Sequence, residues 1–332
     1  MTEMKQAIRL VAVVLVIAAT AGAAEDGDSE SGLFSNLPRI NKHGFFELRG
    51  GYRLQNDPHE KDMSIMESRF QLDLSSYPEW GELKLKTDFW ADAVTEQGEA
   101  EIRQAYVFTR PASYMDLTVG RQILTWGTGD FIFINDLFPK DYQSFFTGRD
   151  VEYLKSPSDA VKASFFSDAA NLDIVFTPRF DPDEFVSGER LSYWNSNLGR
   201  RAGRDAEVTT DKPDEWFDDY ELAARLYRYI NNYQLAFYGD RGFWKNRGGQ
   251  KPNGTAIFPD LDVYGASIRG RLGEGIANAE IGYYLSRDDE SGTDPLINNS
   301  EMRYLVGYSQ EVAKNFTVGL QYYLKQLLDF DE

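Results

Sequence analysis

The feature that most constrains this chain is the alternation of apolar and polar residues in segments of about ten residues. Residues 84–89 (Lys-Leu-Lys-Thr-Asp-Phe) and 316–322 (Phe-Thr-Val-Gly-Leu-Gln-Tyr) show it most clearly. Successive side chains of a strand point to opposite faces, so each segment predicts a strand with one apolar and one polar face. Strands of this kind, joined by links that are alternately short and long, are typical of a membrane barrel with lipid outside and water inside.

The alternation predicts about 13 strands. They lie near residues 43–54, 64–75, 82–92, 100–109, 114–126, 158–167, 171–178, 218–230, 233–243, 261–271, 276–286, 301–311 and 315–325. Every second link is tight, namely 76–81, 110–113, 167–170, 231–232, 273–275 and 313–314. The alternate set includes four long links, 127–157, 179–217, 244–260 and 287–300, which are rich in Gly, Pro, Asn and Asp. Soluble β-sandwiches do not generally sort loops by length in this way, so the fold class predicted is an antiparallel transmembrane β-barrel.

The N-terminus predicts export across the inner membrane. Lys5 and Arg9 precede an apolar stretch, and small residues at 21–23 supply a cleavage site, so residues 1–23 are predicted to be a signal peptide. The alternative, a membrane-anchoring helix, is weaker because the stretch is shorter than the roughly 20 residues that span a bilayer. We expect residues 24–42 to form a periplasmic lead-in and residues 43–332 to form the barrel.

Composition excludes several classes of function. The 332 residues include no cysteine, which excludes disulfide scaffolds and thiolate metal sites, and the net charge of −18 excludes a generic nucleic-acid binder. The acidic residues cluster in predicted loops, where charge keeps loops solvated. The segment 288–292 resembles a calcium loop only loosely, because the later glutamate is missing. We therefore expect no metal site and no cofactor.

The pleat assigns a face to each residue of a strand. The apolar residues predicted to face lipid are Leu72, Leu74, Leu83, Leu85, Phe89, Leu235, Phe237, Ile281, Tyr283, Tyr304, Val306, Val318, Leu320 and Tyr322. The charged residues predicted to face the lumen are Glu47, Arg49, Arg53, Glu67, Arg69, Asp73, Lys84, Lys86, Asp88, Glu101 and Arg103. Lys or Arg facing lipid near the midplane would cost roughly 2–4 kcal/mol each. These charges either pair across strands to brace the wall or line the pore and select solutes.

Residues 120–150 break the alternation. An external loop with apolar residues at 131–134 and 137–138 would expose a large apolar patch, which must be buried somewhere. We expect residues 127–150 to fold back inside the barrel as a constriction, although a lid over the barrel mouth is the alternative. The side chains that would narrow the pore are Arg121, Trp126, Asp136, Lys140, Asp141 and Arg149.

The same stretch carries a family resemblance. The blocks Glu101-Ile-Arg-Gln-Ala-Tyr, Gly120-Arg-Gln with Trp126-Gly127, and Asp136-Leu-Phe-Pro-Lys-Asp141-Tyr resemble a mostly uncharacterised family of Gram-negative outer-membrane barrels near the alginate-export and substrate-specific porins. The matching positions are Arg121, Gln122, Trp126, Gly127, Asp136, Pro139 and Asp141. The resemblance covers residues 100–180 and implies a channel or exporter with an inward-folded loop. The glycines around Thr128 depart from the acidic residue expected after the tryptophan-glycine pair.

Function follows as an expectation from the predicted barrel. We expect a channel in the outer membrane of a Gram-negative bacterium, with small solutes, lipid and lipopolysaccharide, and the barrel assembly machinery as partners and with no nucleic acid. The runner-up is a non-conducting barrel that acts as an adhesin, receptor or structural protein. An enzyme is not expected, because the two histidines, His43 and His59, have no serine that the predicted topology brings close.

The strand count predicts an incomplete barrel. Single-chain bacterial barrels have an even number of strands, so about 14 or more are expected in a complete barrel. The ending Leu328-Asp-Phe-Asp-Glu332 also lacks the terminal aromatic residue usual in barrels that resemble this family. We therefore expect a C-terminal truncation, and a strand missed within 179–217 is the competing explanation.

Overall fold

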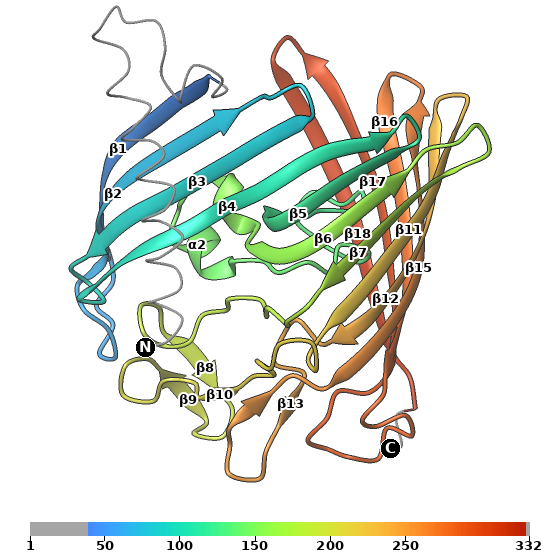
Figure 1. The fold of residues 1–332 in the computed structure, drawn as a ribbon. Coiled ribbons are helices and arrows are strands. Elements are labelled where there is room, and N and C mark those ends of the chain that lie inside the picture. Colours follow the sequence, from blue (N-terminus) through green and yellow to red (C-terminus); the bar gives the residue numbers. More distant parts are fainter. Residues whose placement is uncertain (1–38, 330–332) are drawn as a thin grey trace, which may run out of the picture.

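The structure, a computed structural model, describes residues 39–329. The predicted signal peptide and most of the predicted lead-in lie outside the described residues. Residues 40–42, expected to end the lead-in, instead begin the first strand. The fold is all-β, and its main element is one antiparallel sheet of 13 strands, as the alternation predicts. We call this sheet the wall (Figure 1).

The wall strands follow one another in space in the order of the sequence, each antiparallel to the next. They are β1 (Ile40–Tyr52), β2 (Met63–Ser76), β3 (Gly81–Asp92), β4 (Gln97–Ala112), β5 (Met115–Ile123), β6 (Pro157–Phe165), β7 (Asn171–Thr177), β11 (Glu221–Ile230), β12 (Tyr233–Phe243), β15 (Asp260–Leu272), β16 (Gly275–Ser286), β17 (Glu301–Ala313) and β18 (Phe316–Leu327). Each predicted strand corresponds to one of these, with ends shifted by a few residues.

Tight turns join the wall strands at one end of the sheet (Figure 1). The turn after β11 has Asn231 at φ 55°, the turn after β15 has Gly273 at φ 63°, and the turn after β17 has Asn315 at φ 59°. Gly and Asn tolerate this left-handed conformation, which two-residue hairpin loops require. The local sequence therefore fixes the register of these hairpins.

The long links lie at the opposite end. The link from β7 to β11 contains β8 (Tyr193–Asn195), β9 (Arg200–Ala202) and β10 (Thr210–Asp211), and the link from β12 to β15 contains β13 (Gly249–Gln250) and β14 (Ala256–Ile257). They form a two-stranded hairpin, β8–β9, and a three-stranded sheet, β10–β14–β13. The alternation does not predict these strands, because two or three residues are too few to show a period.

The outward face of the wall is apolar, as the pleat predicts. Leu320 is 76% exposed and lies opposite Tyr308 of β17, whereas the alternate residue Gln321 lies opposite Gly307 on the inward row. The same alternation places Ile281 of β16 outward and its neighbour Glu280 inward, where it is buried. The residues predicted to face lipid lie on this outward row, although Leu74, opposite Leu85, is buried there. None of the helices in residues 39–329 has the length and apolar character needed to cross a membrane.

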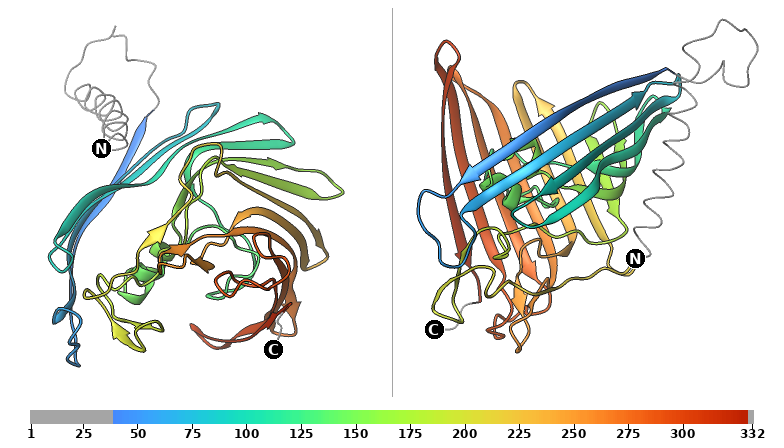
Figure 2. Two further views of the ribbon diagram at one scale, coloured as in Figure 1. Left: turned by 90° about the horizontal axis from the view of Figure 1, so that it is seen from below. Right: turned by 90° about the vertical axis from the view of Figure 1, so that its left-hand side faces the viewer.

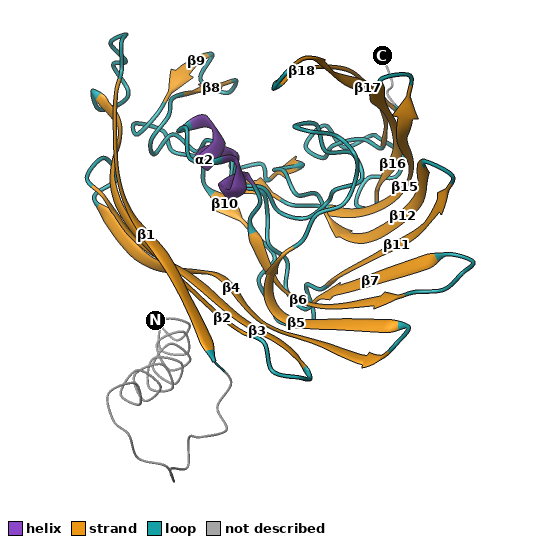
Figure 3. Ribbon diagram, turned by 90° about the horizontal axis from the view of Figure 1, so that it is seen from above, coloured by secondary structure: helices purple, strands orange, loops and turns teal. Residues whose placement is uncertain are grey.

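The wall curves around an interior, and β1 and β18 are its two ends (Figure 3). Residues 39–329 show no pairing between these two strands. The interior is filled in part by the link from β5 to β6, which Figure 2 shows inside the curve of the wall. We call this link, residues 124–156, the inward loop.

Candidate functional site

The inward loop has its own local structure. It contains the short helix α2 (Tyr142–Phe146) and a 3-10 turn, η1 (Val151–Leu154). The Asp141 carboxylate caps α2 by accepting a hydrogen bond from the backbone N–H of Ser144, 2.6 Å away. An aspartate at this position satisfies an N–H that the helix itself leaves without a partner. Asp141 therefore fixes the direction of the loop at the point where it turns.

One flank of the loop packs on apolar side chains of the wall. Ile134 is fully buried in a cluster with Trp244, Leu261, Val263, Tyr284 and Leu305. We call this contact the apolar flank. Closer to β6, Trp126 packs edge-on to Phe138 with ring centroids 4.9 Å apart, in a second buried cluster. The apolar run 131–138 is thus folded inside, as predicted, although Phe131 remains exposed.

Glu280 of β16 holds the backbone of the loop on this side. One carboxylate oxygen accepts from Thr128 (backbone N–H and hydroxyl) and from the N–H of Gly129, 2.9 Å away. The other oxygen accepts from the N–H and the side-chain amide of Asn135, at 3.2 and 3.0 Å. Gly127, at φ 77°, leaves room for the carboxylate, because a Cβ there would lie 3.2 Å from it. Glu280 is buried, and both of its carboxylate oxygens accept hydrogen bonds from the loop.

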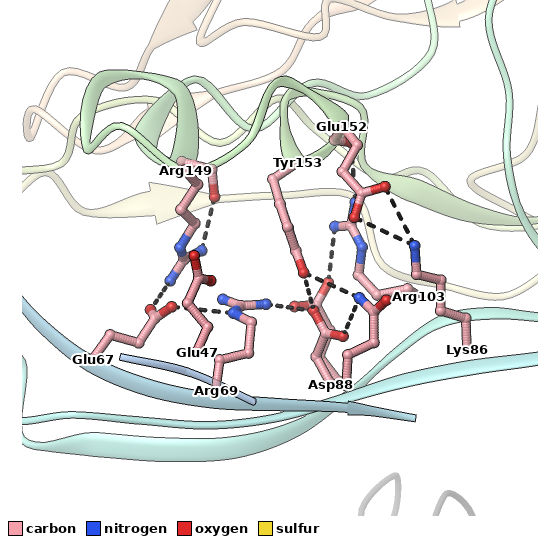
Figure 4. Close-up of polar contacts among 12 residues, drawn as sticks. Glu47, Glu67, Arg69, Lys86, Asp88, Arg103, Arg149, Glu152 and Tyr153 are labelled. Carbon is pink, nitrogen blue, oxygen red and sulfur yellow. Dashed lines mark hydrogen bonds and ion pairs between the residues drawn. The ribbon is translucent and has the colours of Figure 1, made fainter. Parts of the chain in front are cut away.

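The opposite flank of the loop meets charged residues of β2, β3 and β4. Tyr153 lies between two guanidinium groups, 4.6 Å from that of Arg69 and 4.7 Å from that of Arg103. Its hydroxyl donates to the carboxylate of Asp88 at 2.9 Å. Arg69 itself pairs with Glu67 and Asp88, and all three are buried (Figure 4). We call this contact the charged flank.

Three further contacts extend the charged flank. Arg149 of the loop pairs with Glu67 of β2, and Arg49 of β1 donates to the carbonyl of Gly148 at 3.5 Å. Lys86 of β3 lies 3.3 Å from the carboxylate of Glu152 (Figure 4). The inward charges of the first four strands therefore do two things, of which the sequence predicted only the bracing of the wall. Some brace the wall, and others hold the loop.

The remaining predicted site residues lie away from the charged flank. Lys140 and Asp136 pair with each other inside the loop at 3.0 Å, and Lys84 pairs with Asp73 in the wall at 2.5 Å. Gln122 donates to the carbonyl of Ala160 of β6 at 3.1 Å. These four predicted residues are thus held by loop or wall partners within the interior.

The structure places Arg121 differently from the expectation. Arg121 lies opposite Asp159 of β6, 3.4 Å from its carboxylate, and two residues earlier the exposed Val119 lies opposite the exposed Val161. The pleat therefore puts Arg121 on the outward row, where its Nε donates to the carbonyl of Ile102 at 2.7 Å. The break in the alternation near Gly120 hid this change of face.

Burial also changes the acidity of groups in the long links. Burial raises the pKa of the Asp141 carboxyl, although hydrogen bonds from Ser144 oppose the rise. Burial likewise raises the pKa of Asp183 to about 6, although Lys140 lowers it. The Asp183 carboxylate accepts from the backbone N–H of Lys140 at 2.7 Å, so it ties the link after β7 to the inward loop.

Two residues that hold the loop were missed by the sequence analysis. Tyr153 and Glu280 carry no distinguishing motif, and Glu280 is separated from its partner Thr128 by 152 residues. The only signal for Glu280 is a lone carboxylate at an inward position of an otherwise uncharged strand. Contacts of this kind depend on which strands the loop crosses, and the alternation does not report that.

Among residues 39–329 no group of three or more His, Cys, Asp or Glu side chains is placed to hold a metal ion. His59 Nδ1 lies 3.1 Å from the Asp205 carboxylate, and the Ser192 hydroxyl donates to Asp57, which also accepts from the backbone N–H of His59. In this part of the chain no serine hydroxyl is hydrogen-bonded to a histidine ring.

Several solved outer-membrane proteins are similar to this structure. In-vitro folded OmpT, an outer membrane protein of Vibrio cholerae in trimer form, is 11% identical with a TM-score of 0.44, over 86% of this chain and 78% of that chain. Salmonella typhi OmpF in complex with daunomycin is 8% identical with a TM-score of 0.45, over 87% and 79%. A mutant of the Rh. blastica porin is 11% identical with a TM-score of 0.33, over 86% and 94%. No protein-family model and no curated protein matches the chain.

Proposed function

We propose that this chain forms a channel in the outer membrane of a Gram-negative bacterium, and that small solutes pass through it passively. The observation that carries the proposal is the combination of an apolar outward row with an interior that holds charged side chains and a folded-in loop. So many charged side chains are stable within a membrane only when they face water or one another. An inward loop held at both flanks gives a passage of fixed shape.

The proposal assigns the inward loop as the constriction. Tyr153, Arg149 and Glu152 come from the loop, and Arg69, Lys86 and Arg103 come from the wall facing it. These charges are mostly paired. Glu152 pairs with Lys86, but its side chain is still 48% exposed. A solute in the interior would therefore meet polar groups of both signs. The proposal includes no catalytic step, no cofactor and no nucleic acid.

Lipid and lipopolysaccharide are the proposed surroundings of the wall. The outward row presents large side chains that are mostly exposed, such as Phe46, Phe237 and Tyr322. A membrane is the environment in which such a row is stable, and insertion would require the barrel assembly machinery.

Conductance in planar bilayers tests the proposal. Purified protein is refolded in a detergent, and its folding is checked by heat-modifiable migration on gels. We expect stepwise conductance and swelling of liposomes in a panel of sugars, carboxylates, phosphate and hydrophobic compounds. A folded protein that inserts into vesicles but conducts no ions would contradict the proposal and favour an adhesin, receptor or structural protein.

A further inference from the structure

A surface groove lies among small strands of the long links, and Figure 1 shows these strands, β8 to β10 and β13, at the long-link end of the wall. One side is the β8–β9 hairpin, and the other is the β10–β14–β13 sheet. The groove has a volume of about 290 Å³. Its lining includes Tyr193, Trp194, Asn197, Glu207, Gln250 and Asn253. This groove is separate from the inward loop, because none of its lining residues belongs to residues 124–156.

Both sides of the groove are held by hydrogen bonds. On the hairpin, the Tyr193 hydroxyl donates to the carbonyl of Ala206 at 2.6 Å and accepts from the Asn195 amide at 2.9 Å. On the small sheet, the Asn253 side-chain oxygen accepts from the N–H of Thr255 at 3.1 Å. The groove is therefore a shaped feature of the fold and does not depend on a ligand to form.

Several groups in the groove have no protein partner. Trp194 is 66% exposed, which is unusual for an indole on a short hairpin. In residues 39–329, no hydrogen bond is made by the side-chain amides of Asn197 and Gln250 or by the amide nitrogen of Asn253. An amide group offers both donors and an acceptor. The groove thus combines one large flat aromatic face with several uncharged hydrogen-bonding groups.

This chemistry narrows the class of ligand. The lining holds no lysine or arginine among the described residues and includes the carboxylate of Glu207, so an anion such as a phosphate or a uronate is disfavoured. Apart from the rings of Tyr193 and Trp194, the apolar side chains of the lining are those of Val208 and two alanines, so the lining offers little apolar surface to a lipid chain. A neutral pyranose ring has an apolar C–H face for the indole and hydroxyls for the amides and carboxylate.

We propose that this groove binds a neutral sugar ring, with Trp194 stacked on its C–H face and with Asn197, Gln250 and Asn253 bonding its hydroxyls. The source would be either a free oligosaccharide or a glycan chain displayed on a surface. Sugar binding here does not require conduction. A non-conducting barrel with the same groove would bind the sugar equally well. Absence of conductance would therefore contradict the channel proposal and not the sugar-binding proposal.

Titration of the full chain in a detergent without a sugar headgroup tests the site. The probes are maltohexaose, cellohexaose and mannohexaose as free neutral oligosaccharides, a galacturonate hexamer as the anionic counterpart, and a neutral O-chain polysaccharide as the displayed glycan. Binding is followed by tryptophan fluorescence and by calorimetry. We expect saturable binding of at least one neutral probe, and the free and O-chain arms show which source is preferred.

Two variants and one control decide the assignment. Trp194→Ala should weaken binding at least about tenfold, which corresponds to about 1.4 kcal/mol, and Asn197→Ala should weaken it several-fold. Trp216→Ala is the matched control, because Trp216 is also exposed, at 47%, and lies outside the groove. If Trp194→Ala does not fold, Asn197→Ala carries the test. Absence of binding by every neutral probe would overturn the proposal, as would equal binding of the galacturonate hexamer or unchanged affinity in the variant tested.

Discussion

The inward loop meets the wall through two flanks of different chemistry. On the charged flank, Tyr153 lies between Arg69 and Arg103 and donates to Asp88. On the apolar flank, Ile134 is fully buried against side chains of β15, β16 and β17. Both flanks hold the same segment, so the free energy that each contributes to docking of the loop can be compared directly.

The two flanks respond differently to loss of one partner. Burying an apolar side chain stabilises by about 1.5–3 kcal/mol, with no dependence on a particular partner. A buried ion pair gains little over an apolar pair of the same shape, because desolvation offsets the Coulomb attraction, yet removing one partner is costly. We infer that the apolar flank supplies most of the affinity of the loop for the wall, whereas the charged flank fixes which side chains face the interior.

Arg69→Met should give the largest loss of stability. The change leaves the buried carboxylate of Asp88 without its cation and leaves Glu67 with Arg149 alone, and a broken buried pair costs about 3–5 kcal/mol. Denaturant unfolding in lipid vesicles measures the change in the free energy of unfolding. The triple variant Arg69→Met, Glu67→Gln, Asp88→Asn should recover much of the loss. A single variant as stable as the parent would show that the charged flank is not buried.

Ile134→Ala should give the next largest loss. It removes a fully buried side chain from the apolar flank, and large-to-small changes in a core cost about 2–5 kcal/mol. The loss should persist at high salt, since no charge is involved. Ile132→Ala is the matched control, because Ile132 is only partly buried against the same cluster. Equal losses in the two variants would contradict the packing described for Ile134.

Glu280→Gln should lower the free energy of unfolding by an intermediate amount. Buried N–H groups that are left without an acceptor cost about 1–3 kcal/mol. The new NH₂ group would face N–H groups of Thr128 and Gly129 or those of Asn135. Amide hydrogen exchange should therefore rise in 127–136. Glu82→Gln is the control, because Glu82 accepts from Tyr106 in the wall at 3.2 Å and not from the loop. An equal rise of amide exchange in both variants would contradict a specific role of Glu280 in holding the loop.

Lys86→Ala should have the smallest effect on the free energy of unfolding, below about 1 kcal/mol, because partly exposed ion pairs contribute little to stability. Lys86 lies 3.3 Å from Glu152, whose side chain is 48% exposed. The change should instead alter the cation preference of the channel, measured as a reversal potential in a salt gradient. A large loss of stability with no change of reversal potential would mean that this pair is structural.

The difference between the flanks also explains what the sequence could predict. Charges at alternate positions of β1 to β4 share one face of the pleat, and the contacts of Arg49, Arg69, Lys86 and Arg103 lie on the face toward the inward loop. The inward rows of β15 and β17 carry the apolar residues Leu261, Val263 and Leu305, so an apolar side chain there does not mark the outward face. The apolar run in 131–138 predicted that the loop is buried, but not which strands bury it.

Conductance of a variant that lacks residues 130–144 tests most directly whether the inward loop is the constriction. The wall strands pair with one another and not with the loop, so the deletion should leave a folded, heat-modifiable protein. We predict a single-channel conductance several-fold higher than that of the parent, together with faster entry of larger sugars into liposomes. An unchanged conductance in a protein shown to be folded would contradict the account, because the passage would then not run past the loop.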